Sequence, residues 1–280
     1  MATVVRRRKL GMSSAKGIAV SSKQGIKWCR NDLGIPHDDM YIRWGCTANL
    51  PNANATVINS AKAIHCVSNK LEFRRLLNDN NLCPATWFGV EDVPENSLAK
   101  GVIVRPHVHS RGRHIWKCHD WAHLRDVVAI LPQGFYISEF VDKVQEFRVF
   151  VVQGRAVAVA EKTPDNPKAL AWNVAKGGRF DNVSWNNWNV KAVRIAIEGF
   201  NLSGLDFGGV DVMVDAKGSC TILEINSAPS LTSPYRQECM AKALDYIVEN
   251  GKGDIPLINE RGGYLKFIHP ALTNKAKIGE

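Results

Sequence analysis

Two carboxylates and an amide near the C-terminal end of the chain are spaced so that they could bind a metal ion. Glu224 and Asn226 are two residues apart, so an extended strand points both side chains to the same face. The preceding run Asp215-Ala-Lys-Gly218 is typical of a turn. If the hairpin closes over residues 216–219, Asp211 lies opposite Glu224, and all three groups share one face.

These three side chains offer the oxygen ligands that a hard cation prefers. Magnesium takes a few protein oxygens and completes its shell with water and phosphate. The surrounding apolar alternation indicates a half-buried setting, where unpaired carboxylates are unfavourable. We expect the opposite face of the hairpin to join the core through Val210, Val212, Leu223 and Ile225. The alternative is that Asp211 and Glu224 are ordinary strand carboxylates.

The composition is that of an ordinary globular protein, since 45% of the 280 residues are hydrophobic and 22% are charged. This is enough apolar mass for a substantial core divided among more than one lobe. No apolar run approaches the length of a bilayer span, and the N-terminal residues lack the apolar stretch of a signal peptide. Seven scattered cysteines without a C-x-x-C motif predict free thiols in a cytoplasmic protein.

The formal net charge of +9 favours anionic partners such as nucleotides, acidic peptides or nucleic acid. The run from Arg6 to Lys9 could serve as a nucleic-acid arm, but a solvated tail is the simpler interpretation. Nucleic acid is therefore the less favoured partner, and no membrane partner is expected.

Hairpins and helices alternate along the chain. Asn69 and Glu72 predict the start of a helix that is apolar at Leu71, Phe73, Leu76 and Leu77. Strands are expected over residues 102–106, 135–141, 144–152 and 155–161, with a tight hairpin at Gln153-Gly154. Helices are expected over 121–131, 188–200 and 234–249. This mixture predicts an α+β fold rather than one doubly wound sheet.

Taken in order, the motifs resemble the ATP-grasp superfamily, most closely the D-alanine–D-alanine ligases and the ligases that add glutamate to ribosomal proteins and other acceptors. The similarity covers roughly residues 68–235. The motifs that carry it are Asn69-Lys70, Val-Ile-Val-Arg105-Pro, Ser138-Glu139-Phe-Val, Glu146-Phe-Arg148-Val, Asn173-x3-Gly-Gly, Gly209-Val-Asp211 and Leu223-Glu224-Ile-Asn226-Ser-Ala-Pro-Ser. The last motif is the most specific, because its spacing and its trailing Asn-Ser-Ala-Pro both agree.

The resemblance implies an ATP-grasp fold, in which two α+β lobes grip ATP, here preceded by a small N-terminal α/β lobe. We expect this lobe over residues 1–67 and the central ATP-grasp lobe over 68–135, with a phosphate-covering loop at 107–113. The C-terminal ATP-grasp lobe, which holds the metal site, is expected over 136–250. A basic tail over 251–280 follows it.

The resemblance also implies a role for each matching residue. ATP would be bound by Lys70, Arg105 and Lys162 at the phosphates, Glu146 at the ribose, and Glu139, Val141 and Asp142 at the adenine. Mg²⁺, or alternatively Mn²⁺, would be held by Asp211, Glu224 and Asn226. Arg148 and Asn173 would face the reacting acyl phosphate.

The implied enzyme is an ATP- and magnesium-dependent carboxylate–amine ligase. A substrate carboxylate would attack the γ-phosphate of ATP to give an acyl phosphate and ADP. An amine of an amino acid, a peptide or a protein terminus would then displace phosphate and form an amide. Two alternatives stay open: a related phosphotransferase that acts on hydroxyl groups, and a non-catalytic basic binding module that keeps the fold.

The sequence departs from the family pattern at two informative positions. Arg105 stands where many relatives carry lysine, which keeps the charge but changes its geometry. Gly209 stands two residues before Asp211, where D-alanine ligases place an arginine, and this argues against that substrate pair.

Overall fold

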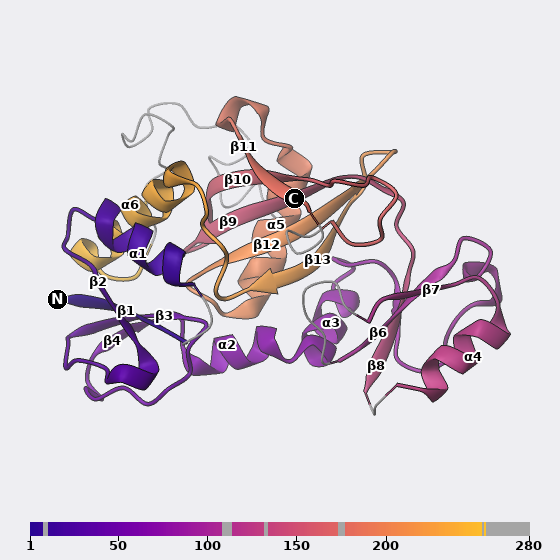
Figure 1. Cartoon of the computed structure of the whole chain (residues 1–280), viewed down its shortest axis with the longest axis horizontal. Coiled ribbons are helices and arrows are strands. Elements are labelled where there is room, and N and C mark those ends of the chain that lie inside the picture. The colour runs from indigo at the N-terminus through magenta and orange to yellow at the C-terminus, as the bar shows by residue number, and fades with distance from the viewer. Residues whose placement is uncertain (8–10, 108–113, 132–133, 173–176, 254, 256–280) are drawn as a thin grey trace.

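The structure of the chain is a computed structural model that describes residues 1–7, 11–107, 114–131, 134–172, 177–253 and 255. Three sheets and the helices that cover them make up the described part (Figure 1). The α+β class predicted from the sequence is confirmed. Asn173, most of the basic loop after His107 and nearly all of the C-terminal tail lie outside the described residues.

The first sheet is parallel and has the strand order β2-β1-β3-β4. Its strands are β1 (Ala2–Arg6), β2 (Lys27–Arg30), β3 (Met40–Trp44) and β4 (Thr56–Ile58), with α1 (Met12–Ser21) between β1 and β2. Every residue of β1 is buried, as expected for a central parallel strand that is covered on both faces.

Two short helices connect this sheet to the rest of the chain, α2 (Ala61–Ser68) and α3 (Lys70–Asp79). The side chain of Asn69 caps α3 by accepting from the backbone N–H of Glu72 at 3.4 Å. The predicted start of this helix is therefore confirmed, and Phe73 and Leu77 are buried on its inner side. The cap places Lys70 at the first position of the helix.

The second sheet is antiparallel and has the order β5-β8-β6-β7. Its strands are β5 (Thr86–Trp87), β6 (Val102–Pro106), β7 (Trp116–Cys118) and β8 (Phe135–Glu139). Helix α4 (Trp121–Ala129) packs on it through Leu124 and Val127. Strand β8 lies between β5 and β6 and ends at Glu139, which pairs with Val102.

The third and largest sheet is antiparallel, with the order β11-β10-β9-β12-β13. Its strands are β9 (Lys143–Val152), β10 (Arg155–Thr163), β11 (Arg179–Val183), β12 (Phe207–Asp215) and β13 (Cys220–Asn226). The predicted hairpin between β9 and β10 is confirmed, since Val152 pairs with Arg155. The two turn residues, Gln153 and Gly154, both have positive φ, which suits a two-residue hairpin.

Both faces of the third sheet are buried. Val149 and Val151 contribute to a core under α5 (Val190–Ser203), α2 and α3, whereas Phe150 and Val152 contribute to a second core under α1 and α6 (Pro234–Asn250). Figure 1 shows α6 beside α1, so this second core joins the N-terminal sheet to the large sheet. Within the described ranges, no helix combines the length and apolar character needed to cross a bilayer.

Candidate active site

The ribbon formed by β12 and β13 places the three expected metal ligands on one face. Asp211 pairs with Glu224, and Gly209 pairs with Asn226, in the antiparallel register. Directly paired residues and residues two apart point the same way in such a ribbon. The register predicted for Asp211 and Glu224 therefore agrees with the structure.

The ribbon also contains a bulge that the sequence pattern did not indicate. The register shifts after Asp211, so Val212 pairs with Ile222 and Leu223 is the extra residue. The prediction that Leu223 fills the core was wrong: Ile222 is fully buried there, while Leu223 lines the hollow beside Glu224. The register beside the turn is shifted by one residue from the expected one, because Cys220 pairs with Val214 and not with Asp215. The extra residue of the bulge compensates for this, so Glu224 still lies opposite Asp211.

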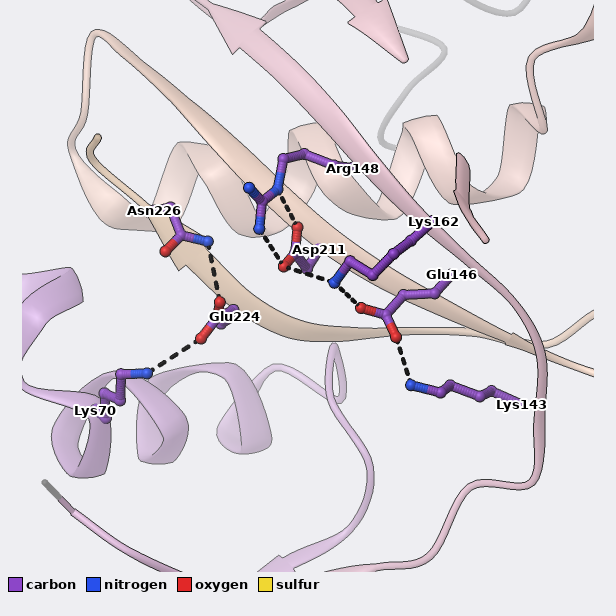
Figure 2. Close-up of polar contacts among 8 residues, drawn as sticks. All are labelled: Lys70, Lys143, Glu146, Arg148, Lys162, Asp211, Glu224 and Asn226. Atoms are coloured by element: carbon purple, nitrogen blue, oxygen red, sulfur yellow. Dashed lines mark hydrogen bonds and ion pairs between the residues drawn. The ribbon is translucent and has the colours of Figure 1, made fainter. Parts of the chain in front are cut away.

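Glu224 is the more accessible of the two carboxylates. Its side chain is 34% exposed and forms an ion pair with Lys70 at 3.1 Å. The amide of Asn226 donates to its other oxygen at 3.2 Å (Figure 2). Burial alone would raise the pKa of Glu224, but Lys70 and Arg148 outweigh it and hold that pKa well below its usual range.

Asp211, by contrast, is enclosed by cations. Arg148, from the neighbouring β9, donates to both of its carboxylate oxygens at 2.6 and 2.7 Å. Lys162 on β10 lies 3.5 Å from the second oxygen. Only 2% of the Asp211 side chain is exposed. Burial would lower the pKa of Arg148, but Asp211 raises it overall.

Glu146 forms the other centre of the same network. It is buried on β9 and contacts the ammonium groups of both Lys143 and Lys162. Figure 2 shows how Lys162 links Glu146 to Asp211. This network joins three cations, Lys143, Arg148 and Lys162, to two carboxylates, Glu146 and Asp211, so it carries one excess positive charge. A cluster of this charge suits an anionic ligand.

Two adjoining hollows lie beside the ribbon and share the side chains of Arg74, Arg105, Tyr136 and Leu223. The first, which we call the Glu224 hollow, is also lined by Lys70 and Glu224. The second, the Glu139 hollow, is also lined by Glu139, Val141 and Lys143. The structure thus brings together five of the expected ligand-binding residues along one continuous depression: Lys70, Arg105, Glu139, Val141 and Glu224.

Other expected residues lie apart from these hollows. Glu146, Arg148 and Lys162 line neither one, and their charged groups form ion pairs with each other and with Asp211. Asp142 is exposed on the connection between β8 and β9. Asn173 lies outside the described residues, so its assignment stays a prediction, as do the individual roles of the other residues.

Sequence reasoning missed Arg74, which lines both hollows. Its side chain is buried and donates to the backbone carbonyl oxygens of Ile222 at 3.4 Å and Leu223 at 2.6 Å. These carbonyls flank the bulge, so Arg74 fixes the backbone just before Glu224. Its position gave a usable signal, since Arg74 follows Phe73 and is four residues from Lys70, within the apolar stripe of α3.

Tyr136 was also missed, and its surroundings show that the hollows are electropositive. Burial raises the pKa of its phenol, but Arg74, Arg105 and Lys70 lower it overall. Lys143 gives a third example of a residue at this site that the motifs did not single out, since it lines the Glu139 hollow and contacts Glu146. Negatively charged phosphates would be favoured in such surroundings.

The ribbon fits a divalent cation in the kind of atoms that it offers. Asp211, Glu224 and Asn226 supply hard oxygen donors on one face, which is the donor set that magnesium accepts. In this structure the positive charges beside these carboxylates belong to Lys70, Arg148 and Lys162. In the described part of the chain, no three His, Cys, Asp or Glu side chains cluster as a metal-binding group, so the amide of Asn226 is needed to complete the set.

Comparison with known proteins agrees with this geometry. The model of a family described as the RimK-like ATP-grasp domain matches residues 89–247. A probable alpha-L-glutamate ligase 2 of Hahella chejuensis is 28% identical over 125 residues, which is 43% of this chain and 40% of the relative. A probable alpha-L-glutamate ligase of Aeromonas salmonicida is 25% identical over 189 residues, 64% of this chain and 62% of the relative. The matches thus span less than two thirds of these relatives.

Solved structures show the same fold. The D-alanine–D-alanine ligase of Bacillus anthracis complexed with ATP has a TM-score of 0.63 and 12% identity, covering 89% of this chain and 96% of that one. The ATP-grasp ligase PsnB complexed with minimal precursor, Mg and ADP has a TM-score of 0.63 and 14% identity, covering 90% of this chain and 97% of that one. Since the family model matches more than half of the chain, the protein belongs to the RimK-like ATP-grasp family.

Proposed function

We propose that the protein is an ATP- and Mg²⁺-dependent ligase that joins a carboxylate to an amine. The observation that carries this proposal is the depression in which Lys70, Arg105, Glu139 and Glu224 come together beside the carboxylate ribbon. Family membership supports it, because the named relatives are ligases. The positive charge of the depression would offset the charge of the triphosphate.

The adenine end of the nucleotide would occupy the Glu139 hollow. Apolar side chains there include Ile103, Val141 and Leu223, with the carboxylate of Glu139 at the edge. The triphosphate would extend toward Arg105 and Lys70, where the Glu224 hollow begins. Lys70 would then leave Glu224 for phosphate oxygens, which frees Glu224 and Asn226 for the metal.

The reaction proceeds in two displacements. An oxygen of the substrate carboxylate attacks the γ-phosphorus, the bond to the β-phosphate bridging oxygen breaks, and ADP departs. The amine nitrogen then attacks the acyl carbon, phosphate leaves with the electron pair of the C–O bond, and the nitrogen loses a proton. Arg148 would stabilise the negative charge that develops on the transferred phosphoryl group. A divalent ion bound by Asp211, Glu224 and Asn226 would supply Lewis-acid charge stabilisation.

The substrates are proposed from the relatives' names and from the chemistry of the site. Glutamate is the first candidate amino acid, since both named relatives are probable alpha-L-glutamate ligases. A peptide or protein terminus is a candidate for the second substrate, because PsnB was solved with its minimal precursor. None of the seven cysteines forms a disulfide bond, which is in keeping with a reducing compartment such as the cytoplasm.

Mass spectrometry of reaction products tests the proposal. Purified protein is incubated with ATP, Mg²⁺ and a library of amino acids and peptides, and ADP release is measured in parallel. A new amide, formed with one ADP for each bond, is the expected result. A stable phosphorylated product would instead favour the phosphotransferase alternative, and nucleotide binding without any product would overturn the ligase assignment.

A variant pair links the product to the site. Glu224→Gln removes one carboxylate from the ribbon and should abolish most turnover, whereas Glu238→Gln removes an exposed carboxylate of α6 and should not change it. Equal activity of the two variants would mean that the ribbon is not the metal-binding element.

A further inference from the structure

Arg236, in the first turn of α6, is a buried cation whose charge has no carboxylate partner among the described ion pairs. Its side chain is 2% exposed. One nitrogen, Nη2, donates to the hydroxyl of Thr232 at 2.9 Å. The other two, Nε and Nη1, are buried without a hydrogen-bond partner in the part of the chain that the structure describes. A buried guanidinium in this state is unfavourable for folding.

The position of Arg236 places it next to the carboxylate network. Three cations surround the ring of Phe180 on β11: Arg148 at 4.7 Å, Lys162 at 5.3 Å and Arg236 at 5.7 Å from the ring centre. Burial lowers the pKa of Arg236, and the charge of Arg148 lowers it further, whereas the nearby charge of Asp181 has a smaller, opposite effect. Arg148 and Lys162 are neutralised by Asp211 and Glu146, so Arg236 retains its charge for another group.

Carboxylates near Arg236 are engaged elsewhere. Asp181, the neighbour of Phe180, is 49% exposed and binds Arg179 and the hydroxyl of Thr163. Asp211 is already bound through both oxygens by Arg148. Neither of these two carboxylates therefore forms an ion pair with Arg236.

The N-terminus of α6 adds to the positive charge around Arg236. Ser233 caps α6 by accepting from the backbone N–H of Arg236 at 3.2 Å, so the positive end of this 17-residue helix lies at the same place. The preceding loop is fixed to the N-terminal lobe, because Ser14 of α1 accepts from the backbone N–H of Leu231 at 2.9 Å. This loop is part of the segment that connects Asn226 to α6.

The nucleotide is an unsuitable partner for Arg236. Neither Arg236 nor Phe180 lines the Glu224 or Glu139 hollow. Instead, Arg236 contacts the same aromatic ring, Phe180, as Arg148 and Lys162 do. Both of these cations also contact Asp211. A group that reached Arg236 would thus approach the reacting end of the nucleotide from another direction, as a second substrate must.

We propose that Arg236, together with the hydroxyl of Thr232 and the N-terminus of α6, binds a carboxylate of an acidic amino-acid substrate. The inference rests on the ligase function proposed above and names the subsite that selects an anionic substrate. The guanidinium supplies charge-assisted donors, which bind a carboxylate more strongly than neutral donors do. The bound carboxylate is a recognition group and is not consumed at Arg236.

Isothermal titration with L-glutamate tests this assignment in the presence of Mg²⁺ and a non-hydrolysable ATP analogue. The wild type is compared with Arg236→Met and with the control Arg194→Met, which removes an exposed arginine of α5 on the other side of the large sheet. Arg236→Met should weaken L-glutamate binding by about 10- to 100-fold, the effect of losing a charge-assisted hydrogen bond. The affinity for the nucleotide analogue should be unchanged, and the control should match the wild type.

A second set of titrations identifies the carboxylate. L-glutamine lacks the side-chain carboxylate, and glutamic acid α-amide lacks the main-chain one. The compound that has lost the recognised carboxylate should bind the wild type and Arg236→Met with equal, weak affinity. The other compound should keep the full difference between the two proteins.

Thermal unfolding distinguishes a binding role from a structural one. Methionine removes an unpaired buried charge, so the ligand-free Arg236→Met variant should have a Tm equal to or above that of the wild type. A lower Tm with unchanged L-glutamate affinity would make Arg236 a structural residue. Absence of L-glutamate binding in the wild type, equal binding in both proteins, or a matching loss of nucleotide affinity would each overturn the proposal. These titrations need no turnover, so they are independent of the product assay for ligase activity.

Discussion

Asp211 and Glu224 face each other across β12 and β13, yet each carboxylate is held by a different cation. Arg148 encloses Asp211, whose side chain is almost entirely buried, whereas Lys70 binds a Glu224 that remains partly exposed. The two carboxylates of the expected metal site therefore differ in how readily a metal ion could replace the protein cation. We expect this replacement at Glu224, the more exposed of the two.

Replacement of Lys70 by methionine should reveal this exchange. If Mg²⁺ binds Glu224 as proposed, Lys70 competes with it, and Lys70→Met should raise the affinity for Mg²⁺ alone by about two- to fivefold, the scale of a partly exposed ion pair. The same variant should bind ATP more weakly, since the proposed contact of Lys70 with phosphate is lost. Titration of Mg²⁺ and of ATP measures both effects, and Lys62→Met on the exposed side of α2 is the control. Unchanged Mg²⁺ affinity would show that Lys70 does not compete with the metal.

The Arg148–Asp211 pair should contribute strongly to stability. Arg148→Met would leave the buried Asp211 with only the longer contact to Lys162, and we expect a loss of about 3–5 kcal/mol in the free energy of unfolding. In the double variant Arg148→Met/Asp211→Leu the loss should be smaller than the sum of the single losses. Urea unfolding of the wild type, the two single variants and the double variant measures this coupling. Arg179→Met is the control, because the loss of this exposed ion pair should cost less than about 1 kcal/mol. If the losses of Arg148→Met and Asp211→Leu simply add in the double variant, the two residues are not coupled.

Glu224 should make the protein more sensitive to acid. Its pKa is lowered in the folded state, chiefly by Lys70 and Arg148 acting against the effect of burial. The folded protein therefore binds a proton here less readily than the unfolded chain. The resulting stability is present above the unfolded pKa of about 4.3 and is lost as the pH falls through the folded pKa. Below about pH 4.5, the Tm of the wild type should fall more steeply than that of Glu224→Gln, and parallel curves would refute the linkage.

Local sequence signals were enough to predict the elements that carry the site. The Asn69 cap, the Gln153-Gly154 turn and the polar turn before β13 each depend on chemistry within a few residues. The spacing of Glu224 and Asn226 on one strand is likewise a local property. Family resemblance added the fold, because its motifs occur in a fixed order.

The contacts that join distant segments were not predictable in this way. Arg148, Lys162 and Glu146 were expected to face ligands, but in the structure they neutralise each other and Asp211 across three strands. The bulge at Leu223 depends on Arg74, which comes from a helix about 150 residues earlier. No periodicity within β13 encodes that partner, so the register error near the turn was unavoidable from local pattern alone.

Gly209 provides a test of how tightly the face beside Asp211 is packed. A Cβ atom at this position would lie 2.8 Å from the Cβ of Pro229 and 3.4 Å from the Cδ of Arg148. Gly209→Ala should therefore displace the loop after Asn226 or the Arg148 side chain, at a cost of about 1–3 kcal/mol in unfolding free energy. Turnover should also fall, because both displaced groups adjoin the site.

The double variant Gly209→Ala/Pro229→Gly separates packing from other effects of the alanine. Removal of the Pro229 side chain relieves its clash, so the added alanine should cost less in the Pro229→Gly background than in the wild type. Urea unfolding of the four proteins in this cycle gives the coupling. An equal cost in both backgrounds would show that Pro229 does not limit the space at position 209. In that case the contact with the Arg148 side chain would be what limits the space at position 209.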